Sequence, residues 1–253
     1  MPEWWMWGLG LGVYAYGIEP QWIQVTRHEV RAPVQAPLTI AHLTDLHTKR
    51  LAYRERKLLR LLDRLRPDVI VITGDTVANR GTHRHARALL QHLRAPLGVW
   101  AVRGNWEHYR AERDERSFFE SLNIKFLSNG NAKLRDDVWV VGLDEECFGH
   151  PDEQLALAGV PPGVCVIALF HTPVSFPRVA GRCHVALSGH THGGQIRLPF
   201  LPALVVPPAS GPYREGWYQH RGSRMYVSRG LGTSGVPLRF FCRPELAFIS
   251  LKG

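Results

Sequence analysis

Five short apolar segments of the chain each end in a polar side chain that could bind a metal ion. The segments read LTIAHLTDLH, DVIVITGD, VWAVRGN, CVIALFH and HVALSGHTH. Their length and their β-branched and aliphatic residues predict buried strands. Because loops at strand ends can present side chains toward one point, we interpret the polar residues that end these segments as one candidate site.

Helical periodicity appears between the predicted strands. Residues 54–66 place Leu58, Leu61, Leu62 and Leu65 on one face, and a basic face (Arg54, Arg56, Lys57, Arg60 and Arg64) lies largely opposite. Further helices are predicted over residues 83–93 and 112–122, and further strands over 124–127, 138–143, 225–228 and 246–251. This alternation indicates one α/β domain with helices flanking sheets.

The N-terminal segment is apolar and carries no charge over residues 4–18. As a helix it would be about 22 Å long at about 1.5 Å per residue, shorter than a hydrocarbon core of about 30 Å. It also lacks the basic start and cleavage site of a signal peptide. Its tryptophans and tyrosines favour the lipid headgroup level. We interpret it as an interfacial anchor or the remnant of a spanning helix, with a packed strand or hairpin as the alternative.

These patterns divide the chain into two parts. Residues 1–37 form an apolar, membrane-interacting leader and an extended segment with prolines at positions 20, 33 and 37. Residues 38–253 form the catalytic domain. Basic residues (Arg27 and Arg31) follow the leader and only Glu3 precedes it, which favours a catalytic domain on the cytoplasmic face of the inner membrane.

The charge balance narrows the class of partner. The chain has 253 residues, with 31 Lys and Arg against 22 Asp and Glu, a net charge of +9. Such a balance favours a phosphorylated substrate, an anionic membrane surface or nucleic acid. Nucleic acid is not expected, because no recognisable binding motif is present. The four cysteines have no C-x-x-C spacing, which favours a reducing compartment.

The polar residues that end the five segments form a seven-member set, namely Asp45, His47, Asp75, Asn105, His171, His190 and His192. Carboxylate, amide and imidazole ligands together suit manganese, iron or zinc better than calcium or magnesium. Two such ions lie about 3.5–4 Å apart and need a carboxylate that touches both. Asp75, in its Gly-Asp turn, is the predicted bridge.

The order D-x-H, G-D, G-N, H and G-H-x-H resembles the calcineurin-like metallophosphoesterases, from about Leu38 to Leu251. The stretches GHTHGGQIRLPFL and VSRGLGTSGVPLRFFCRPEL resemble a bacterial membrane-associated subgroup. The resemblance implies a four-layer αββα sandwich with two central mixed sheets. It also implies two divalent metal ions, with manganese preferred and zinc or iron as alternatives. Asp45, His47 and His192 would hold the first ion, Asn105, His171 and His190 the second, and Asp75 would bridge them.

One position departs from the pattern of similar enzymes, which read G-N-H followed by Asp or Glu. Here the sequence is Gly104-Asn105-Trp106-Glu107-His108. The indole of Trp106 cannot act as the acid that assists a leaving group. His108 is the candidate replacement if its loop turns it inward, and a solvent-facing histidine if it does not.

The missing histidine suggests the bond that is cut. An alkoxide leaving group needs an acid, whereas a phosphate leaving an anhydride is already stable, with a second pKa of about 6. We therefore expect hydrolysis of a phosphoanhydride or phosphodiester, with a lipid-linked nucleotide such as UDP-2,3-diacylglucosamine as the hypothesis. A phosphodiesterase or phosphatase on a soluble substrate is the alternative within enzymes, and an inactive scaffold is the alternative outside them.

An apolar, proline-rich segment, residues 197–208, follows the last predicted ligand. Beside the metal site it would be a docking surface for acyl chains or a bilayer. Its other interpretation is a strand edge and crossover packed into the core. Together with the leader and the basic helix face, the first interpretation supplies two signals for membrane attachment.

Overall fold

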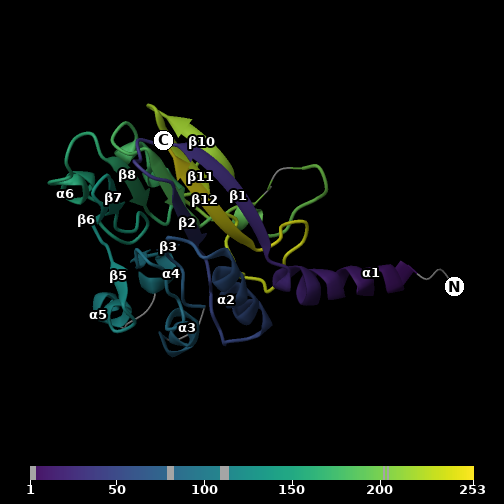
Figure 1. Ribbon diagram of the computed structural model, residues 1–253. Helices are drawn as coiled ribbons and strands as arrows, with labels where there is room; N and C mark the ends of the chain where they lie inside the picture. The colour runs from purple at the N-terminus through teal and green to yellow at the C-terminus, as the bar shows by residue number, and fades with distance from the viewer. Residues whose placement is uncertain (1–3, 79–82, 109–113, 202, 204) are drawn as a thin grey trace.

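Two six-stranded sheets form the centre of the computed structural model, which describes residues 4–78, 83–108, 114–201, 203 and 205–253. The first sheet has the order β1-β12-β2-β3-β4-β5 and the second β10-β11-β9-β8-β7-β6 (Figure 1). Strands β2 to β5 are parallel, as are β7, β8, β9 and β11. The antiparallel pairs are β12 with β2, β6 with β7, and β10 with β11. Both sheets are therefore mixed, as predicted.

The bounds of the strands follow the apolar segments closely. In the first sheet they are β1 Gln24–Arg31, β2 Leu38–Leu43, β3 Val69–Thr73, β4 Val99–Val102, β5 Ile124–Phe126 and β12 Glu245–Lys252. In the second they are β6 Gly130–Arg135, β7 Val138–Gly142, β8 Cys165–Leu169, β9 Val185–Ser188, β10 Gly216–His220 and β11 Ser223–Val227. Every residue of β3, β4, β8 and β9 is buried. Continuous apolar segments are what strands covered on both faces require.

Helices cover the outer face of each sheet. The helices are α1 Trp4–Val13, α2 Tyr53–Leu65, α3 His83–Leu90, α4 Asn105–His108, α5 Glu115–Glu120, α6 Glu153–Leu157 and α7 Phe176–Val179. One apolar cluster joins the first sheet to α2, α3 and α5, and another joins the second sheet to α6 and α7. A third lies between the sheets. The result is the predicted four-layer sandwich.

The predicted helices are confirmed with small shifts in their bounds. The helix predicted over 54–66 spans Tyr53–Leu65 and buries Leu58 and Leu62. The helix predicted over 83–93 ends at Leu90. Of the helix predicted over 112–122, the structure describes Glu115–Glu120, and residues 109–113 lie outside the described part of the chain.

Three strands were not predicted, because they carry few apolar residues. Strand β1 reads QVTRHEVR and contains one buried residue, whereas β6 and β10 contain none. All three lie at sheet edges, where one backbone edge and much of the side-chain surface can face solvent. The segment predicted as merely extended thus contains a sheet strand. The first sheet begins at Gln24, before Leu38, where the catalytic domain was predicted to start.

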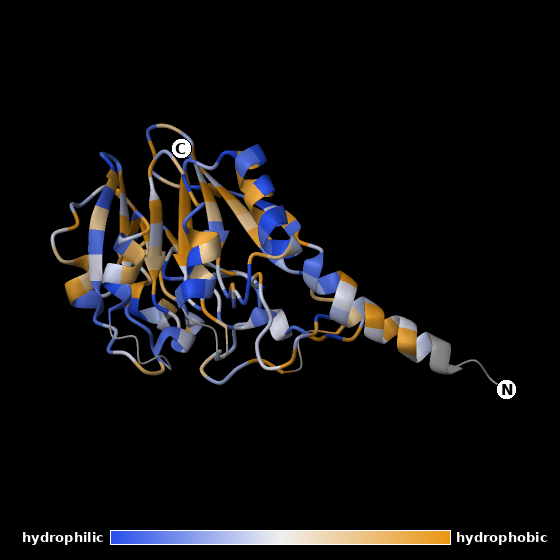
Figure 2. Ribbon diagram, turned by 90° about the horizontal axis from the view of Figure 1, so that it is seen from below, coloured by the Kyte–Doolittle hydropathy of each residue, from blue (hydrophilic) through white to orange (hydrophobic). Residues whose placement is uncertain are grey.

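The apolar N-terminal segment is helical throughout its described residues. Helix α1 continues into a π-helical turn at Tyr14–Ile18 and a 3₁₀ turn at Glu19–Gln21. It projects away from the sandwich (Figures 1 and 2), so the strand or hairpin alternative is wrong. Within the described residues, no helix has both the length and the apolar character needed to cross a membrane.

The base of this helix is joined to the domain by polar contacts. The carboxylate of Glu19 is fully buried and accepts hydrogen bonds from the backbone N–H groups of Phe241 and Cys242. The N–H of Arg239 donates to the carbonyl of Ala15 at 2.9 Å. Because Cys242 in turn contacts the backbone of His192, the base of the helix is held beside the candidate site.

Candidate metal centre

All seven predicted ligands lie just beyond the carboxyl ends of parallel strands, in loops or at the start of the short helical turns that follow. Asp45 and His47 follow β2, Asp75 follows β3, and Asn105 follows β4; His171 follows β8, and His190 and His192 follow β9. Since each sheet directs this end of its parallel strands toward the same region, the loops converge. The side chains are buried, except for Asn105, which is half-buried.

The backbone of these loops is unusually bent. Five of the seven ligands have positive φ angles: Asp45 51°, His47 41°, Asp75 55°, His190 71° and His192 51°. This left-handed region costs a non-glycine residue roughly 1 kcal/mol or more, so the surrounding structure must impose it. The strain turns side chains that would otherwise continue along their strands toward a common centre.

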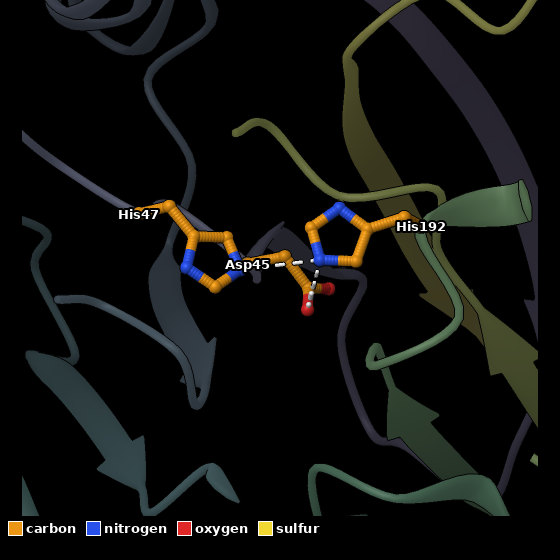
Figure 3. A group of neighbouring side chains, drawn as sticks. All are labelled: Asp45, His47 and His192. Atoms are coloured by element: carbon orange, nitrogen blue, oxygen red, sulfur yellow. Dashed lines mark hydrogen bonds and ion pairs between the residues drawn. The ribbon is translucent and has the colours of Figure 1, made fainter. Parts of the chain in front are cut away.

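Asp45, His47 and His192 form the first group of potential ligands (Figure 3). The Nε2 atoms of His47 and His192 are 3.1 Å apart, and the rings are stacked. The Nε2 atom of His192 lies 3.3 Å from Asp45 Oδ1. Two imidazole nitrogens and a carboxylate oxygen thus face one point.

Asn105, His171 and His190 form the second group. The Oδ1 atom of Asn105 lies 2.9 Å from His171 Nε2 and 3.1 Å from His190 Nδ1. The two imidazole nitrogens are themselves 3.3 Å apart. This cluster matches the ligand set that the family resemblance implies for a second ion.

Asp75 lies between the two groups. Its Oδ2 atom is 3.5 Å from His47 Nε2 in the first group and 3.4 Å from His171 Nε2 in the second. The other carboxylate oxygen, Oδ1, accepts a hydrogen bond from the backbone N–H of Trp106 at 2.9 Å. One oxygen atom between both clusters is the geometry that a bridging ligand needs.

Hydrogen bonds to backbone carbonyls orient three of the imidazoles. The Nδ1 atoms of His47 and His171 face the carbonyls of Val77 at 3.1 Å and Thr73 at 2.7 Å, and His190 Nε2 faces that of Pro208 at 2.7 Å. A carbonyl can only accept, so each of these nitrogens donates and the other ring nitrogen keeps its lone pair. Those lone pairs are the ones directed at the centre.

The donor set therefore fits a metal ion. In the second group, with both imidazoles neutral, His171 Nε2, His190 Nδ1, Asn105 Oδ1 and Asp75 Oδ2 are all acceptors. Buried acceptors brought this close repel one another unless a cation lies between them. Nitrogen and oxygen ligands of this kind suit a transition metal.

The pKa values show that burial disfavours charge on most of these side chains. Burial lowers the pKa of His47 to about 3 and that of His190 to about 4. Burial also disfavours the charged ring of His171, but Asp75 and Asp45 outweigh it and raise the pKa to about 10. Burial raises the pKa of Asp75 to about 7. A cation between these groups would supply the charge that a proton otherwise supplies.

Glu107 is a site residue that the sequence reasoning did not assign. Its buried carboxylate accepts hydrogen bonds from the backbone N–H groups of Gly104, Asp75 and Thr76 at 2.9, 2.9 and 2.7 Å. It also accepts one from the hydroxyl of Thr76 at 2.8 Å. It thereby joins the loop that carries Asp75 to the loop that carries Asn105. Glu107 stands where the family pattern G-N-H is followed by Asp or Glu. This match was the feature of the sequence that could have identified it.

The same two loops approach so closely that only glycine fits at the contact. A Cβ atom on Gly104 would collide with the Oδ1 atom and the backbone nitrogen of Asp75. The Gly-Asn and Gly-Asp turns are therefore steric requirements of the site.

Trp106 and His108 occupy different surroundings on the short helix α4. The Trp106 ring lies edge-on to the His47 ring, with centroids 5.7 Å apart. The Nε2 atom of His108 accepts from Arg103 at 3.3 Å, and its ring lies 6.2 Å from that of Phe148. Burial and the neighbouring Arg103 lower the pKa of His108. His108 remains a prediction as a proton donor, and this pairing favours its neutral form.

The segment 197–208 leaves several apolar side chains exposed. Phe200 and Val205 are largely exposed, and Leu198 and Leu201 are about half exposed, whereas Ala203 is buried. Residues 202 and 204 lie outside the described chain. The interpretation as a strand packed into the core is wrong for the described residues, because none of them forms a strand and most of the apolar ones face solvent.

Comparison with known proteins gives a consistent result. Residues 38–194 match the profile of the family described as calcineurin-like phosphoesterase. The uncharacterized metallophosphoesterase YkuE of Bacillus subtilis is 32% identical over 97% of this chain and 91% of its own. A transmembrane protein with metallophosphoesterase domain from Bos taurus is 32% identical over 91% of this chain and 56% of its own.

A solved structure is similar in fold. TT1561 of Thermus thermophilus superposes with a TM-score of 0.50 and 13% sequence identity, over 78% of this chain and 91% of that chain. At this identity the likeness concerns the fold alone. It agrees with the sandwich described above.

Proposed function

Because the chain belongs to the calcineurin-like phosphoesterase family and is a metal-dependent phosphoesterase, we propose that it hydrolyses the phosphoanhydride of a lipid-linked nucleotide at a membrane surface. The observation that carries this proposal is the pairing of a two-group metal centre with Trp106 at the position of the usual acid. UDP-2,3-diacylglucosamine is the specific substrate proposed.

The residues of the centre have separate tasks. One ion would be held by Asp45, His47 and His192. The other would be held by Asn105, His171 and His190, and Asp75 would contact both ions. When bound, two divalent ions acidify water and neutralise phosphoryl oxygens. The neutral amide of Asn105 reduces the negative charge that faces an anionic substrate.

Manganese is the metal we propose, with zinc or iron as alternatives. The mixture of carboxylate, amide and imidazole ligands supports a transition ion. Metal analysis of the purified protein should find two equivalents per chain. Failure to bind any of the three metals under metal-replete conditions would instead support the inactive scaffold.

Trp106 supports an anhydride as the bond that is cut. Its indole N–H is not acidic enough to protonate an alkoxide, and the neutral, Arg103-bound His108 is a poor acid. A phosphate leaving group needs no such proton, since its second pKa is about 6. General acid catalysis would otherwise contribute about 10²–10⁴ in rate.

Turnover of two substrates tests this proposal directly. With Mn²⁺, we expect kcat/KM for UDP-2,3-diacylglucosamine to exceed that for a simple alkyl phosphodiester by at least about 100-fold. This factor is the lower end of the rate acceleration that general acid catalysis provides. W106H should raise alkyl ester hydrolysis, and W106F, which adds no acid, should not. Faster cleavage of the alkyl ester by the unaltered protein would reject the anhydride and favour a phosphodiesterase on a soluble substrate.

Three exposed apolar regions support the membrane proposal. They are α1 with its continuation (Trp7, Leu9, Leu11, Val13, Tyr16 and Ile18), the loop after β9 (Ile196, Leu198, Phe200, Leu201 and Val205), and the segment with Val236 and Phe241. We call these residues the apolar surface. Backbone bonds join its parts, since Arg197 N–H donates to Phe240 and Arg239 N–H to Ala15.

Charge and similarity add to this support. The basic helix α2 contacts the turn at Glu19–Gln21, at the base of α1 (Figure 1). Basic residues beside an apolar helix favour an anionic membrane surface. One relative is named as a transmembrane protein. Arg27 and Arg31 after the leader favour the cytoplasmic face of the inner membrane.

A further inference from the structure

A cavity of about 310 Å³ adjoins the metal centre and reaches the base of the N-terminal helix. Its lining includes the predicted metal ligand His47 and, from the turns that follow α1, Tyr16 and Gln21. Lys49, Arg50 and Thr233 also line it. Three segments distant in sequence thus enclose one space that leads from the candidate reaction centre to α1.

Two cations in this cavity have no partner among the residues that the structure describes. Lys49 and Arg50 are exposed, and within the described chain neither side chain makes a recorded hydrogen bond or ion pair. The other charged lining residues, Arg54 and Glu55, pair with each other at 2.6 Å. The cavity therefore carries two uncompensated positive charges beside the metal centre, which suits an anionic group.

We propose that this cavity is the subsite for the phosphate that is not attacked, and that Lys49 and Arg50 bind it. The proposal rests on the proposed function, since only a diphosphate substrate has such a group. It makes Lys49 and Arg50 specificity-determining residues.

The position of the cavity also explains how a lipid-linked substrate would lie. Tyr16 and Gly17, in the turn that continues α1, form part of the wall. With α1 in the membrane interface, the cavity would open at the level of the headgroups. A diphosphate could then reach the metals while its acyl chains stay in the bilayer.

Lys49 and Arg50 differ in a way that a kinetic experiment can use. Lys49 also lines a second, smaller space with His47 and Trp106, whereas Arg50 lines the larger of these two spaces and not the smaller. We expect R50A to raise KM for UDP-2,3-diacylglucosamine in nonionic micelles about tenfold or more, as loss of a hydrogen bond to a charged group does. Its KM for bis(p-nitrophenyl) phosphate, which has one phosphorus, should stay within about twofold. K49A should raise KM for both.

The matched control is R182A/R221A, which also removes two exposed positive charges. Arg182 and Arg221 line a different cavity, with Pro161 and Pro162, near the amino ends of β8 and β9. These ends lie opposite the metal centre. The control should change neither KM. Equal effects of R50A on both substrates, or none on either, would overturn the subsite.

A binding measurement separates this inference from the proposed function. Equilibrium dialysis of the metal-free protein with inorganic pyrophosphate should show affinity at least about tenfold weaker for K49A/R50A than for the unaltered protein or the control. Equal affinities would overturn the subsite even if the lipid is hydrolysed. If the lipid is not hydrolysed while pyrophosphate binding depends on Lys49 and Arg50, the proposed substrate fails and the anion site stands.

Discussion

Glu107 shows how a single residue outside the ligand set can determine the geometry of the metal centre. Four hydrogen bonds end on its two carboxylate oxygens, and they come from the loops that hold Asp75 and Asn105. The bend at Asp75, with a positive φ of 55°, lies directly beside one of these bonds. Glu107 is thus a positioning residue, because it acts through ligands and touches no substrate.

Replacing this carboxylate tests that role. In E107Q one oxygen becomes an amide donor, which faces backbone N–H groups and cannot accept from them. We expect the affinity for Mn²⁺, measured by titration of activity and by metal analysis, to fall about 10–100-fold, as loss of a residue that orients ligands does. Excess metal should recover much of the rate.

The control for this experiment is E120Q, since Glu120 is exposed and forms only a surface ion pair with Arg116. It should bind metal like the unaltered protein. If E107Q bound metal equally well, Glu107 would be a buried structural acid with no effect on the centre.

Residue types and spacing were sufficient to predict the seven side chains that meet at the candidate metal centre, because each follows an apolar strand closely. Glu107 was not assigned because its partners are backbone groups, which leave no mark in a sequence. The orientations of the histidine rings depend on carbonyls of Val77, Thr73 and Pro208 for the same reason.

At the scale of the elements, Glu245 joins strands of both sheets. It begins β12 and accepts hydrogen bonds from Thr26 of β1 and Tyr226 of β11, at 2.6 and 2.5 Å. The backbone N–H of Arg229 donates to it at 2.9 Å. Burial acts to raise the pKa of this carboxyl, but Arg229 and the donated hydrogen bonds outweigh burial and lower it.

A lowered pKa in the folded state predicts how stability depends on pH. The ionised Glu245 stabilises the fold above its unfolded pKa of about 4.3, and this contribution is lost as pH falls through the folded value. E245Q should therefore reduce the free energy of unfolding by about 1–3 kcal/mol near pH 7 and by less below about pH 4. Urea denaturation of both proteins with a chelator present measures the difference. A difference that stays constant with pH would contradict the assignment.

The edge strands are the elements that local sequence patterns could not predict. Buried strands such as β3 and β8 were predicted because both faces are covered and nearly every residue is apolar. Strand β1 is mostly polar and charged, and its pairing with β12 connects positions more than 200 residues apart. No local pattern encodes a pairing of that kind.

For the whole molecule, α1 and the apolar surface lead to a prediction about membranes. Leu9 and Leu11 are more than half exposed, and burial of a leucine side chain contributes about 1.5–3 kcal/mol. L9E/L11E should therefore reduce partitioning onto anionic liposomes at least about tenfold in a sedimentation assay.

Point substitutions suit this experiment better than removal of residues 1–20, because that deletion would remove the buried Glu19 beside His192. The control is Q219E/H220E, which adds the same two charges at exposed positions of the edge strand β10. It should sediment with liposomes like the unaltered protein. Equal loss in both variants would indicate simple charge repulsion from the lipid.

The sequence by itself determined the α/β class, the seven candidate ligands and the departure at Trp106, because buried strands and the residues that end them are local patterns. Only the tertiary structure decided which lone pairs face the candidate metal centre, where Glu107 and Glu245 act, and that residues 16–21, 49–50 and 233–237 contribute to one cavity. These features depend on contacts between segments far apart in the chain. Their free energies come from burial and from hydrogen bonds that no local pattern records.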